Sequence, residues 1–265
     1  MNAWVHLLKK ELRLGMSAFL VPVLTFLLLT GVAAYFGSRH GFAWEVVFGV
    51  ALFATGFQVF YLVYYLLHSL HAEKRKMHLW LHSTMPAYGL LLAKVAAGII
   101  SLLVTLLITG TVLWISLYQA EHISEQLQMV NVTNLGIFGG THLLLAAISF
   151  AGFTIFYWMV YLLFNRYLGS FLSLLATLAI FVIGSSALSA FKNTAVYEWV
   201  TTWGEIHLTG ITESINFETS LEAGTEVTTQ VGNLSLYFGF YVFEAMIVIA
   251  LFVTACWMLD RKVEV

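Results

Sequence analysis

The sequence predicts an all-α membrane protein with six transmembrane helices. Hydrophobic residues make up 60% of the chain and charged residues only 10%, a composition that excludes an ordinary soluble domain. A helix needs about 20 apolar residues to cross the hydrocarbon core of a bilayer. Six stretches reach this length, with Glu244 as their only charge: 14–38, 46–72, 95–120, 126–165, 167–191 and 234–259. Because their apolar residues are continuous rather than alternating, they exclude a transmembrane β-barrel.

These stretches form a single transmembrane domain that covers residues 1–265. We expect an interfacial helix at residues 2–14, before the first crossing. The crossings themselves are expected at about 17–37, 44–70, 90–118, 138–163, 168–190 and 235–259. A cytoplasmic segment, 71–89, joins the second crossing to the third, and an extracytoplasmic segment, 191–234, joins the fifth to the sixth.

The positions of the basic residues orient the helices. With both termini in the cytoplasm, ten Lys and Arg residues lie on the inner face and two on the outer face. The inner residues are Lys9, Lys10, Arg13, Lys74, Arg75, Lys76, Lys94, Arg166, Arg261 and Lys262; the outer residues are Arg39 and Lys192. This asymmetry follows the positive-inside rule and predicts a multi-pass protein with cytoplasmic termini. The net charge of −2 gives no sign of a nucleic-acid partner, so membrane lipid is the expected surrounding.

The N-terminal segment has the pattern of an amphipathic helix that lies on the inner leaflet. Its apolar side chains fall on one helical arc, and its basic side chains fall on the opposite arc. Glu11 lies inside the apolar arc, which suggests that a protein partner covers part of that face. The alternative is that residues 2–14 are the frayed start of the first transmembrane helix.

The extracytoplasmic segment divides into two parts. Apolar residues recur at helical spacing in the first part: Val196, Trp199, Val200, Trp203 and Ile206. We therefore expect an amphipathic helix that rests against the outer leaflet. The second part, residues 209–230, is rich in Thr and Glu and is predicted to be a loop.

The most specific pattern in the chain is the sequence HAEKRKMHLWLHSTMPAYGLLLAK, at residues 71–94. It runs from a charged cluster through a short amphipathic helix to a Ser-Thr-Met-Pro turn, with Lys94 downstream. This pattern resembles the coupling segment of the type-2 ABC exporter permeases. The resemblance extends over most of the chain, through the interfacial N-terminal helix, the six crossings, a short turn at 165–167 and outer helices between the fifth and sixth crossings.

The resemblance implies that the cytoplasmic segment docks into a groove of a separate ABC ATP-binding subunit. The residues expected to make this contact are Glu73, Lys74, Arg75, Lys76, Leu79, Trp80, Leu81, Ser83 and Pro86. The chain has no G-x-x-x-x-G-K-[ST] phosphate-binding loop. We therefore expect no enzymatic activity and no bound cofactor in this chain, with ATP and Mg²⁺ bound by the partner subunit. The implied function is export of an unidentified substrate by alternating access, in a bacterial plasma membrane.

Small residues at regular spacing suggest a close contact between two helices. Gly169, Ser173 and Thr177 recur every four residues in the fifth crossing, and small residues let helices approach closely in lipid. The contact is either a subunit interface or packing within one chain. The resemblance favours an interface with a second copy or a paralogue of the permease, and it adds Thr25 and Gly31 from the first crossing.

Glu244 lies well inside a predicted crossing, and His142 is its candidate polar partner. An intramembrane carboxylate is costly and therefore a candidate functional residue. Three roles stay open for it: a structural hydrogen bond, contact with a cationic substrate, or proton coupling. The last role defines the alternative function, a stand-alone proton-coupled secondary transporter, and a membrane enzyme or scaffold is a third possibility.

Two histidine pairs have the spacing of metal ligands on a helix. They are His68 with His71 and His78 with His82. Membrane di-iron enzymes need several such clusters, whereas this chain has one neighbourhood of them. We therefore expect no metal site.

Overall fold

The computed structural model describes residues 3–74, 86–120, 132–208, 213–220, 224–231 and 234–261. These residues form a predominantly helical protein with two small antiparallel sheets. Five of the described helices are long and apolar enough to cross a membrane: Met16–His40, Ala43–Glu73, Ala87–Gln119, Val132–Lys192 and Phe238–Asp260. The chain is therefore a membrane-embedded helical protein, as the sequence predicted.

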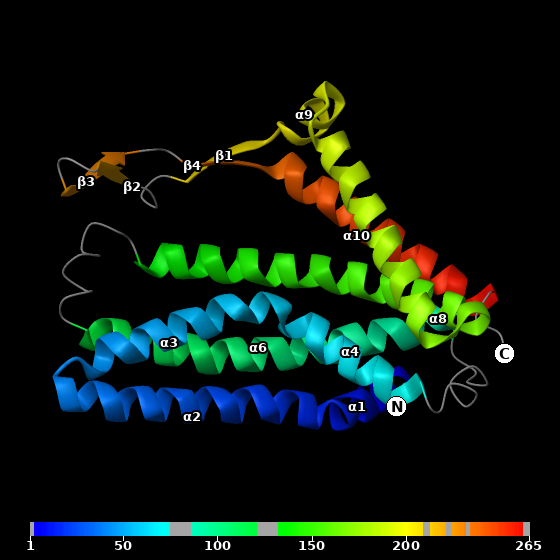
Figure 1. The fold of residues 1–265 in the computed structure, drawn as a ribbon, viewed down its shortest axis with the longest axis horizontal. Coiled ribbons are helices and arrows are strands. Elements are labelled where there is room, and N and C mark those ends of the chain that lie inside the picture. Colours follow the sequence, from blue (N-terminus) through cyan, green and yellow to red (C-terminus); the bar gives the residue numbers. More distant parts are fainter. Residues whose placement is uncertain are drawn as a thin grey trace.

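The elements follow the chain in the order α1 (Ala3–Leu14), α2 (Met16–His40), α3 (Ala43–Phe57), η1 (Gln58–Phe60), α4 (Tyr61–Lys74), α6 (Ala87–Gln119), α8 (Val132–Lys192), α9 (Ala195–Thr201), β1 (Glu205–Leu208), β2 (Glu213–Ser220), β3 (Gly224–Val231), β4 (Leu234–Tyr237) and α10 (Phe238–Arg261). Helices α2, α3, α6 and the first part of α8 lie alongside one another (Figure 1). The start of α1 and the end of α10 lie towards the same end of the molecule (Figure 1).

Two glycines allow α2 to turn tightly into α3. Gly41 ends α2 with a φ of 84°, a left-handed conformation that glycine adopts without steric cost. A side chain on Gly37 would approach the backbone too closely, because its Cβ would lie 2.7 Å from the Cα atom of Ala43. The second predicted crossing then contains a break of its own, since the 3₁₀ turn η1 separates α3 from α4.

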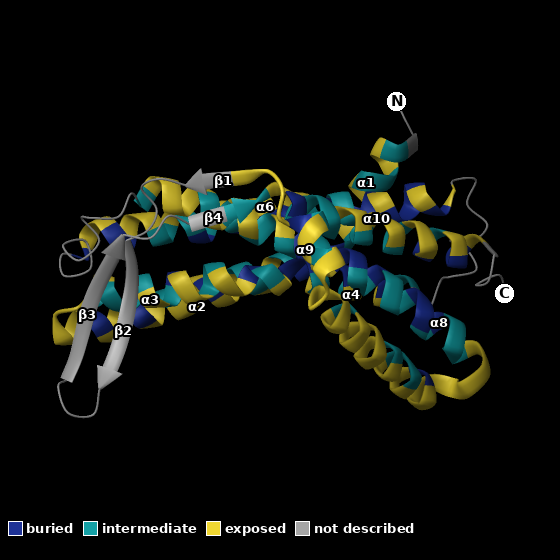
Figure 2. Ribbon diagram, turned by 90° about the horizontal axis from the view of Figure 1, so that it is seen from above, coloured by how far each residue is buried: buried dark blue, intermediate teal, exposed yellow. Residues whose placement is uncertain are grey.

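The long helix α8 is a helical hairpin. Gly169 interrupts it with φ 74° and ψ 169°, a non-helical conformation that other residues avoid. The two halves pack together, with the rings of Tyr157 and Phe181 centred 5.4 Å apart. Both views of the fold show the chain doubling back (Figures 1 and 2). The reversal lies at Gly169 and not at 165–167, where the sequence predicted a turn, because those residues continue the helix.

The amphipathic helix predicted at the start of the outer segment is shorter than expected. Helix α9 ends at Thr201, so Trp203 and Ile206 lie beyond it. Gly204 has a φ of 70° and begins the turn into β1. The prediction of outer helices between the fifth and sixth crossings is therefore only partly correct, since the described part of this segment contains one short helix and four strands.

The prediction of a loop at 209–230 is wrong for its described residues. Strands β2 and β3 pair antiparallel there, from Glu213 opposite Val231 to Ser220 opposite Gly224. Strand β1 pairs with β4 in the same way, so α10 begins at Phe238 and not at residue 235. The sequence signal was present, because β-branched Thr, Val and Ile residues recur through these strands and favour extended backbone.

The buried core lies among α1, α4, α6, α8 and α10. Its most deeply buried large apolar side chains are Leu62, Leu66, Leu91, Leu102, Ile155, Met159 and Leu259. The second half of α8 is different, because most of its side chains are exposed (Figure 2). Phe171, Leu174 and Leu178 are among its exposed apolar residues. This surface is free to contact lipid or another protein.

Candidate functional site

A buried cluster of charged side chains lies where α1, α4 and α6 meet. Glu11 comes from α1, Ser69 and Glu73 from α4, and Lys94 from α6. Ser69 and Glu73 are four residues apart and therefore share one face of α4. We call these four residues, with Lys10 at the rim, the charge cluster.

Lys94 is the centre of the charge cluster. Its Nζ atom lies 2.7 Å from Oε2 of Glu11 and 2.7 Å from Oε2 of Glu73. It also donates a hydrogen bond of 2.9 Å to Oγ of Ser69, whose hydroxyl donates in turn to Oε2 of Glu11 at 3.1 Å. The ammonium group therefore donates hydrogen bonds to Glu11 and Ser69 and forms a close ion pair with Glu73. The side chain of Lys94 is 0% exposed and that of Glu11 is 1% exposed.

Lys10 balances the charge at the edge of the cluster. Its Nζ atom lies 2.9 Å from Oε1 of Glu73 and 3.9 Å from Oε1 of Glu11, and its side chain is 57% exposed. Two carboxylates therefore meet two ammonium groups, so the cluster has no net charge. Burial alone would lower the pKa of Lys10, but its hydrogen bond to Glu73 and the charges of Glu73 and Glu11 outweigh burial and raise it.

Backbone and aromatic contacts hold the end of α1 in place beside the cluster. The hydroxyl of Tyr65 donates to the backbone oxygen of Glu11 at 3.2 Å. The same carbonyl oxygen also accepts from the backbone N–H of Gly15 at 2.9 Å, so it has two donors. The tyrosine side chain lies so close to Gly15 that a Cβ there would clash with it. On the neighbouring helix α2, Ser17 Oγ lies 3.3 Å from Nε2 of His68.

The cluster explains the position of Glu11 in an apolar arc. Leu7, Leu8 and Leu12 of that arc pack against the core of the same chain. The sequence suggested that a separate protein covers Glu11, but Lys94 and Ser69 cover it from within the chain. The apolar arc of α1 therefore packs against the rest of the same chain. This packing also excludes the alternative that residues 2–14 are the frayed start of α2.

Of the residues expected to dock with an ATP-binding subunit, only Glu73 and Pro86 have described side chains. Glu73 and Pro86 border residues 75–85, which lie outside the described part of the chain. Arg75, Lys76, Leu79, Trp80, Leu81 and Ser83 fall in that stretch, and the side chain of Lys74 is likewise outside it. The Glu73 side chain is only 12% exposed and faces Lys94. Pro86 caps α6 and is exposed.

The structure places Glu244 and His142 on neighbouring helices, α10 and α8. Nδ1 of His142 lies 3.2 Å from the hydroxyl of Tyr241, which precedes Glu244 by one helical turn. Among the described residues, His142 therefore forms its side-chain hydrogen bond with Tyr241 and not with Glu244. Glu244 lines a small cavity of about 120 Å³ together with Lys192.

The small residues predicted to form an interface have different surroundings. Ser173 is fully buried and donates to the backbone oxygen of Gly169 at 2.6 Å, while Thr177 donates to the backbone oxygen of Ser173 at 2.8 Å. Thr25 and Gly31 are exposed on α2. Ser173 therefore packs within the chain, and Gly169 has the backbone role of reversing α8.

Sequence reasoning noticed Glu11 and Lys94 separately but did not pair them. It missed Ser69 and Lys10 as members of the cluster. One signal was available, because a lysine well inside an apolar helix needs a nearby acidic partner. The two charges are 83 residues apart in the chain, so the sequence did not identify that partner.

No family model matches the chain, and no curated protein or solved structure is significantly similar to it.

Proposed function

We propose that the chain is the membrane-spanning permease subunit of an ATP-driven exporter of the type-2 ABC class. It crosses a bacterial plasma membrane six times, when the two halves of α8 are counted as separate crossings. Both termini and residues 75–85 lie in the cytoplasm, as the distribution of Lys and Arg predicts. ATP and Mg²⁺ bind to a separate subunit, and an unidentified substrate moves by alternating access.

The charge cluster is the observation that best supports this proposal. A permease driven by a separate ATPase needs a rigid connection between the docking segment and the transmembrane helices. Glu73 is two residues before the stretch 75–85, and Lys94 joins it to Glu11 through contacts of 2.7 Å. Force applied to that stretch would therefore move α1, α4 and α6 together.

A second copy or a paralogue completes the transporter in this proposal. The exposed apolar surfaces of α2 and of the second half of α8 are the candidate contact surfaces. On α2 they include Leu24, Leu28 and Phe36, which are 60%, 65% and 58% exposed. Thr25 and Gly31 lie on the same helix and would allow close approach.

Co-purification from the native membrane tests the proposal. We expect an ATP-binding subunit to accompany the tagged chain in equal amounts and to hydrolyse ATP in the complex. Trp80→Ala should release that subunit, because Trp80 is the largest apolar side chain of the docking segment. Trp44→Ala is the matched control, since Trp44 lies at the start of α3, far from residue 80 in the chain. A chain that purifies alone, and binds no ATPase after cross-linking in membranes, would contradict the proposal.

The cavity beside Glu244 favours one alternative, a proton-coupled secondary transporter that works alone. Glu244 and Lys192 line this cavity where α8 packs against α10. In this alternative, the Glu244 carboxyl group carries the proton that is moved during transport. Glu244→Gln separates the two functions. The exporter should keep transport driven by ATP, whereas the secondary transporter should lose uptake or efflux driven by a pH gradient.

A further inference from the structure

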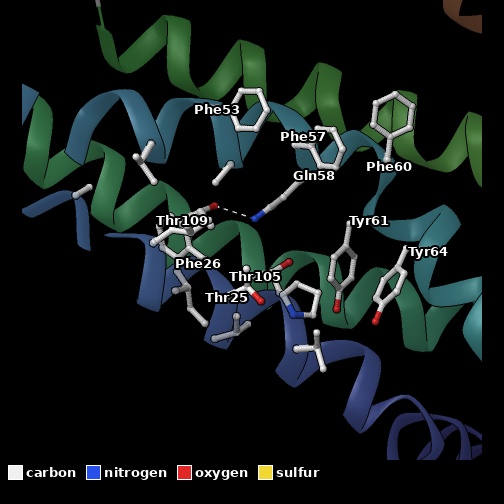
Figure 3. A pocket seen from close by; sticks show the side chains of 18 of the residues that line it. Thr25, Phe26, Phe53, Phe57, Gln58, Phe60, Tyr61, Tyr64, Thr105 and Thr109 are labelled. Carbon is white, nitrogen blue, oxygen red and sulfur yellow. Dashed lines mark hydrogen bonds between the residues drawn. The ribbon is translucent and has the colours of Figure 1, made fainter. Parts of the chain in front are cut away.

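A second site lies in a large cavity among α2, α3 and α6, away from the charge cluster. Its volume is about 850 Å³, within the range of about 300–1,000 Å³ that binds drug-sized molecules. Pro22 and Phe26 of α2, Phe53 and Phe57 of α3, and Ile108 of α6 are part of its apolar lining. Several of these side chains surround the space in Figure 3.

Gln58 brings a polar group into this apolar lining. It begins the turn η1, midway along the 31-residue helical stretch Ala43–Glu73, and it is 8% exposed. Its Nε2 atom donates to Oγ1 of Thr109 at 2.9 Å (Figure 3). The Thr109 hydroxyl donates its own hydrogen to the backbone oxygen of Leu106 at 3.4 Å. The amide nitrogen, and not the amide oxygen, therefore faces Thr109.

The polar groups in the cavity wall include hydroxyl groups, which can donate or accept, and one amide oxygen, which can only accept. The Tyr61 hydroxyl is buried without a hydrogen-bond partner among the described residues. Oε1 of Gln58 is buried and has no hydrogen-bond partner among the described residues. Thr105 also lines the cavity and donates its hydroxyl hydrogen to the backbone oxygen of Leu102 at 2.9 Å. Its remaining lone pairs, like those of Thr109, can only accept. A buried acceptor without a donor is costly, so a ligand that supplies a donor gains affinity here.

The depth of Gln58 narrows the choice of occupant. The middle of a membrane-spanning helix lies about 15 Å from either edge of the ~30 Å hydrocarbon core. A phospholipid offers only acyl chain at that depth, and an acyl chain has no donor. No acidic or basic side chain is among the described residues that line the cavity, so a charged ligand would find no charged partner among them.

We propose that this cavity binds an uncharged, drug-sized apolar molecule that carries a hydroxyl or N–H group. The donor bonds to Oε1 of Gln58, which a rotation about the broad terminal torsion of the glutamine amide turns towards the ligand. The ligand reaches the cavity from the bilayer, past the exposed side chains of Leu29, Val32 and Phe53. This site exists in the single chain and does not depend on an ATPase partner.

A matched pair of fluorescent probes tests the proposal on the full chain in detergent micelles. The probes are 1-hydroxypyrene and 1-methoxypyrene at neutral pH, and binding is followed by energy transfer from tryptophan. We expect saturable binding in which the hydroxyl probe binds about tenfold more tightly, the factor that a hydrogen bond of about 1.4 kcal/mol gives. Gln58→Leu should abolish this preference, so that both probes bind equally.

Two further variants keep the result interpretable. Gln119→Leu makes the same change at the exposed end of α6 and should keep the tenfold preference. Ala54→Trp fills the cavity and should abolish saturable binding of both probes. Equal affinity of the two probes for the unmodified chain would overturn the proposal. Equal uptake of the probes by micelles with and without the protein would also overturn it, because the probes would then be partitioning into detergent and not binding to the chain. A third contrary result would be probe binding to the monomer that disappears when the chain dimerises. The cavity wall would then be a subunit interface and not a ligand site.

Discussion

Replacing Lys94 by methionine tests the charge cluster most directly. The substitution keeps the length and apolar stem of the side chain but removes its charge and three contacts, to Glu11, Glu73 and Ser69. Glu73 keeps its ion pair with Lys10 at 2.9 Å. Glu11, which is 1% exposed, keeps a serine hydrogen bond and a lysine 3.9 Å away. Breaking a buried pair in this way typically costs about 3–5 kcal/mol. We expect the free energy of unfolding to fall by that amount.

A double substitution separates the lost ion pair from lost packing. Glu11→Leu together with Lys94→Met leaves Glu73 and Lys10 as a neutral pair, with no carboxylate stranded in the core. Apolar replacement of a buried ion pair is often neutral for stability. We therefore expect the double variant to recover most of the stability that Lys94→Met loses. The coupling energy from the double-mutant cycle should exceed about 1 kcal/mol, because the two side chains are in contact.

The measurement is SDS-induced unfolding of the purified chain in mixed micelles. Lys9→Met is the matched control, because Lys9 is exposed on α1 and is not a member of the charge cluster. It should change stability by less than about 0.5 kcal/mol. If Lys94→Met costs no more than this control, or if the double variant is less stable than Lys94→Met alone, the cluster is not a buried ionic network and the reasoning fails.

Three other substitutions test features around the cluster and the hairpin. Gly169→Ala should destabilise the chain by about 1–3 kcal/mol, because φ 74° with ψ 169° is a conformation that essentially only glycine adopts. Gly136→Ala, inside the helix with free space around it, should not. Gly15→Ala should clash with the Tyr65 side chain, and unfolding measurements should show that Tyr65→Leu in the same chain relieves the loss. Lys10→Met should cost less than about 1 kcal/mol at pH 7, because the Lys10 side chain is 57% exposed and Glu73 keeps its contact with Lys94. Since the pKa of Lys10 is raised, that contribution is complete below about pH 10.5 and is lost only as the pH rises through the higher folded value. A cost of Lys10→Met that appears only at acidic pH would contradict this assignment.

The membrane-length helices were readable from the sequence because one-dimensional hydropathy contains most of the needed information. A continuous apolar stretch must satisfy its backbone internally, and a helix does so without knowing its neighbours. The exact reversals were harder to predict. Gly169 was noticed for its small size, whereas its role comes from a backbone conformation that a spacing argument does not reveal. The outer strands were missed because polar Thr and Glu residues were interpreted as a loop, although their β-branched neighbours favoured strands.

The site residues were harder to predict because their partners are distant in sequence. Glu11 was conspicuous as an acid in an apolar arc, but the hydrophobic pattern alone cannot tell whether its partner is another protein or Lys94 of the same chain. Gln58 gave an even weaker signal, since one amide in a long apolar stretch resembles an ordinary interhelical hydrogen bond. It became informative only when Thr109 was found to occupy its nitrogen and leave its oxygen unpaired.

Helix α6 links the two sites. It contributes Lys94 to the charge cluster and Thr109 to the cavity wall, 15 residues further along the same helix and therefore about 22 Å away at 1.5 Å per residue. The described α6 contains neither proline nor a non-helical residue, so it can move as a rigid body. Helix α4 similarly joins the cluster to η1, where Gln58 lies. Because the charge cluster joins α4 to α6, Gln58 and Thr109 would move together, and a tilt imposed at Glu73 and Lys94 would shift them relative to the α2 wall of the cavity. If the proposed function is correct, this geometry allows a force applied at the charge cluster to alter ligand affinity halfway along the membrane-spanning helices.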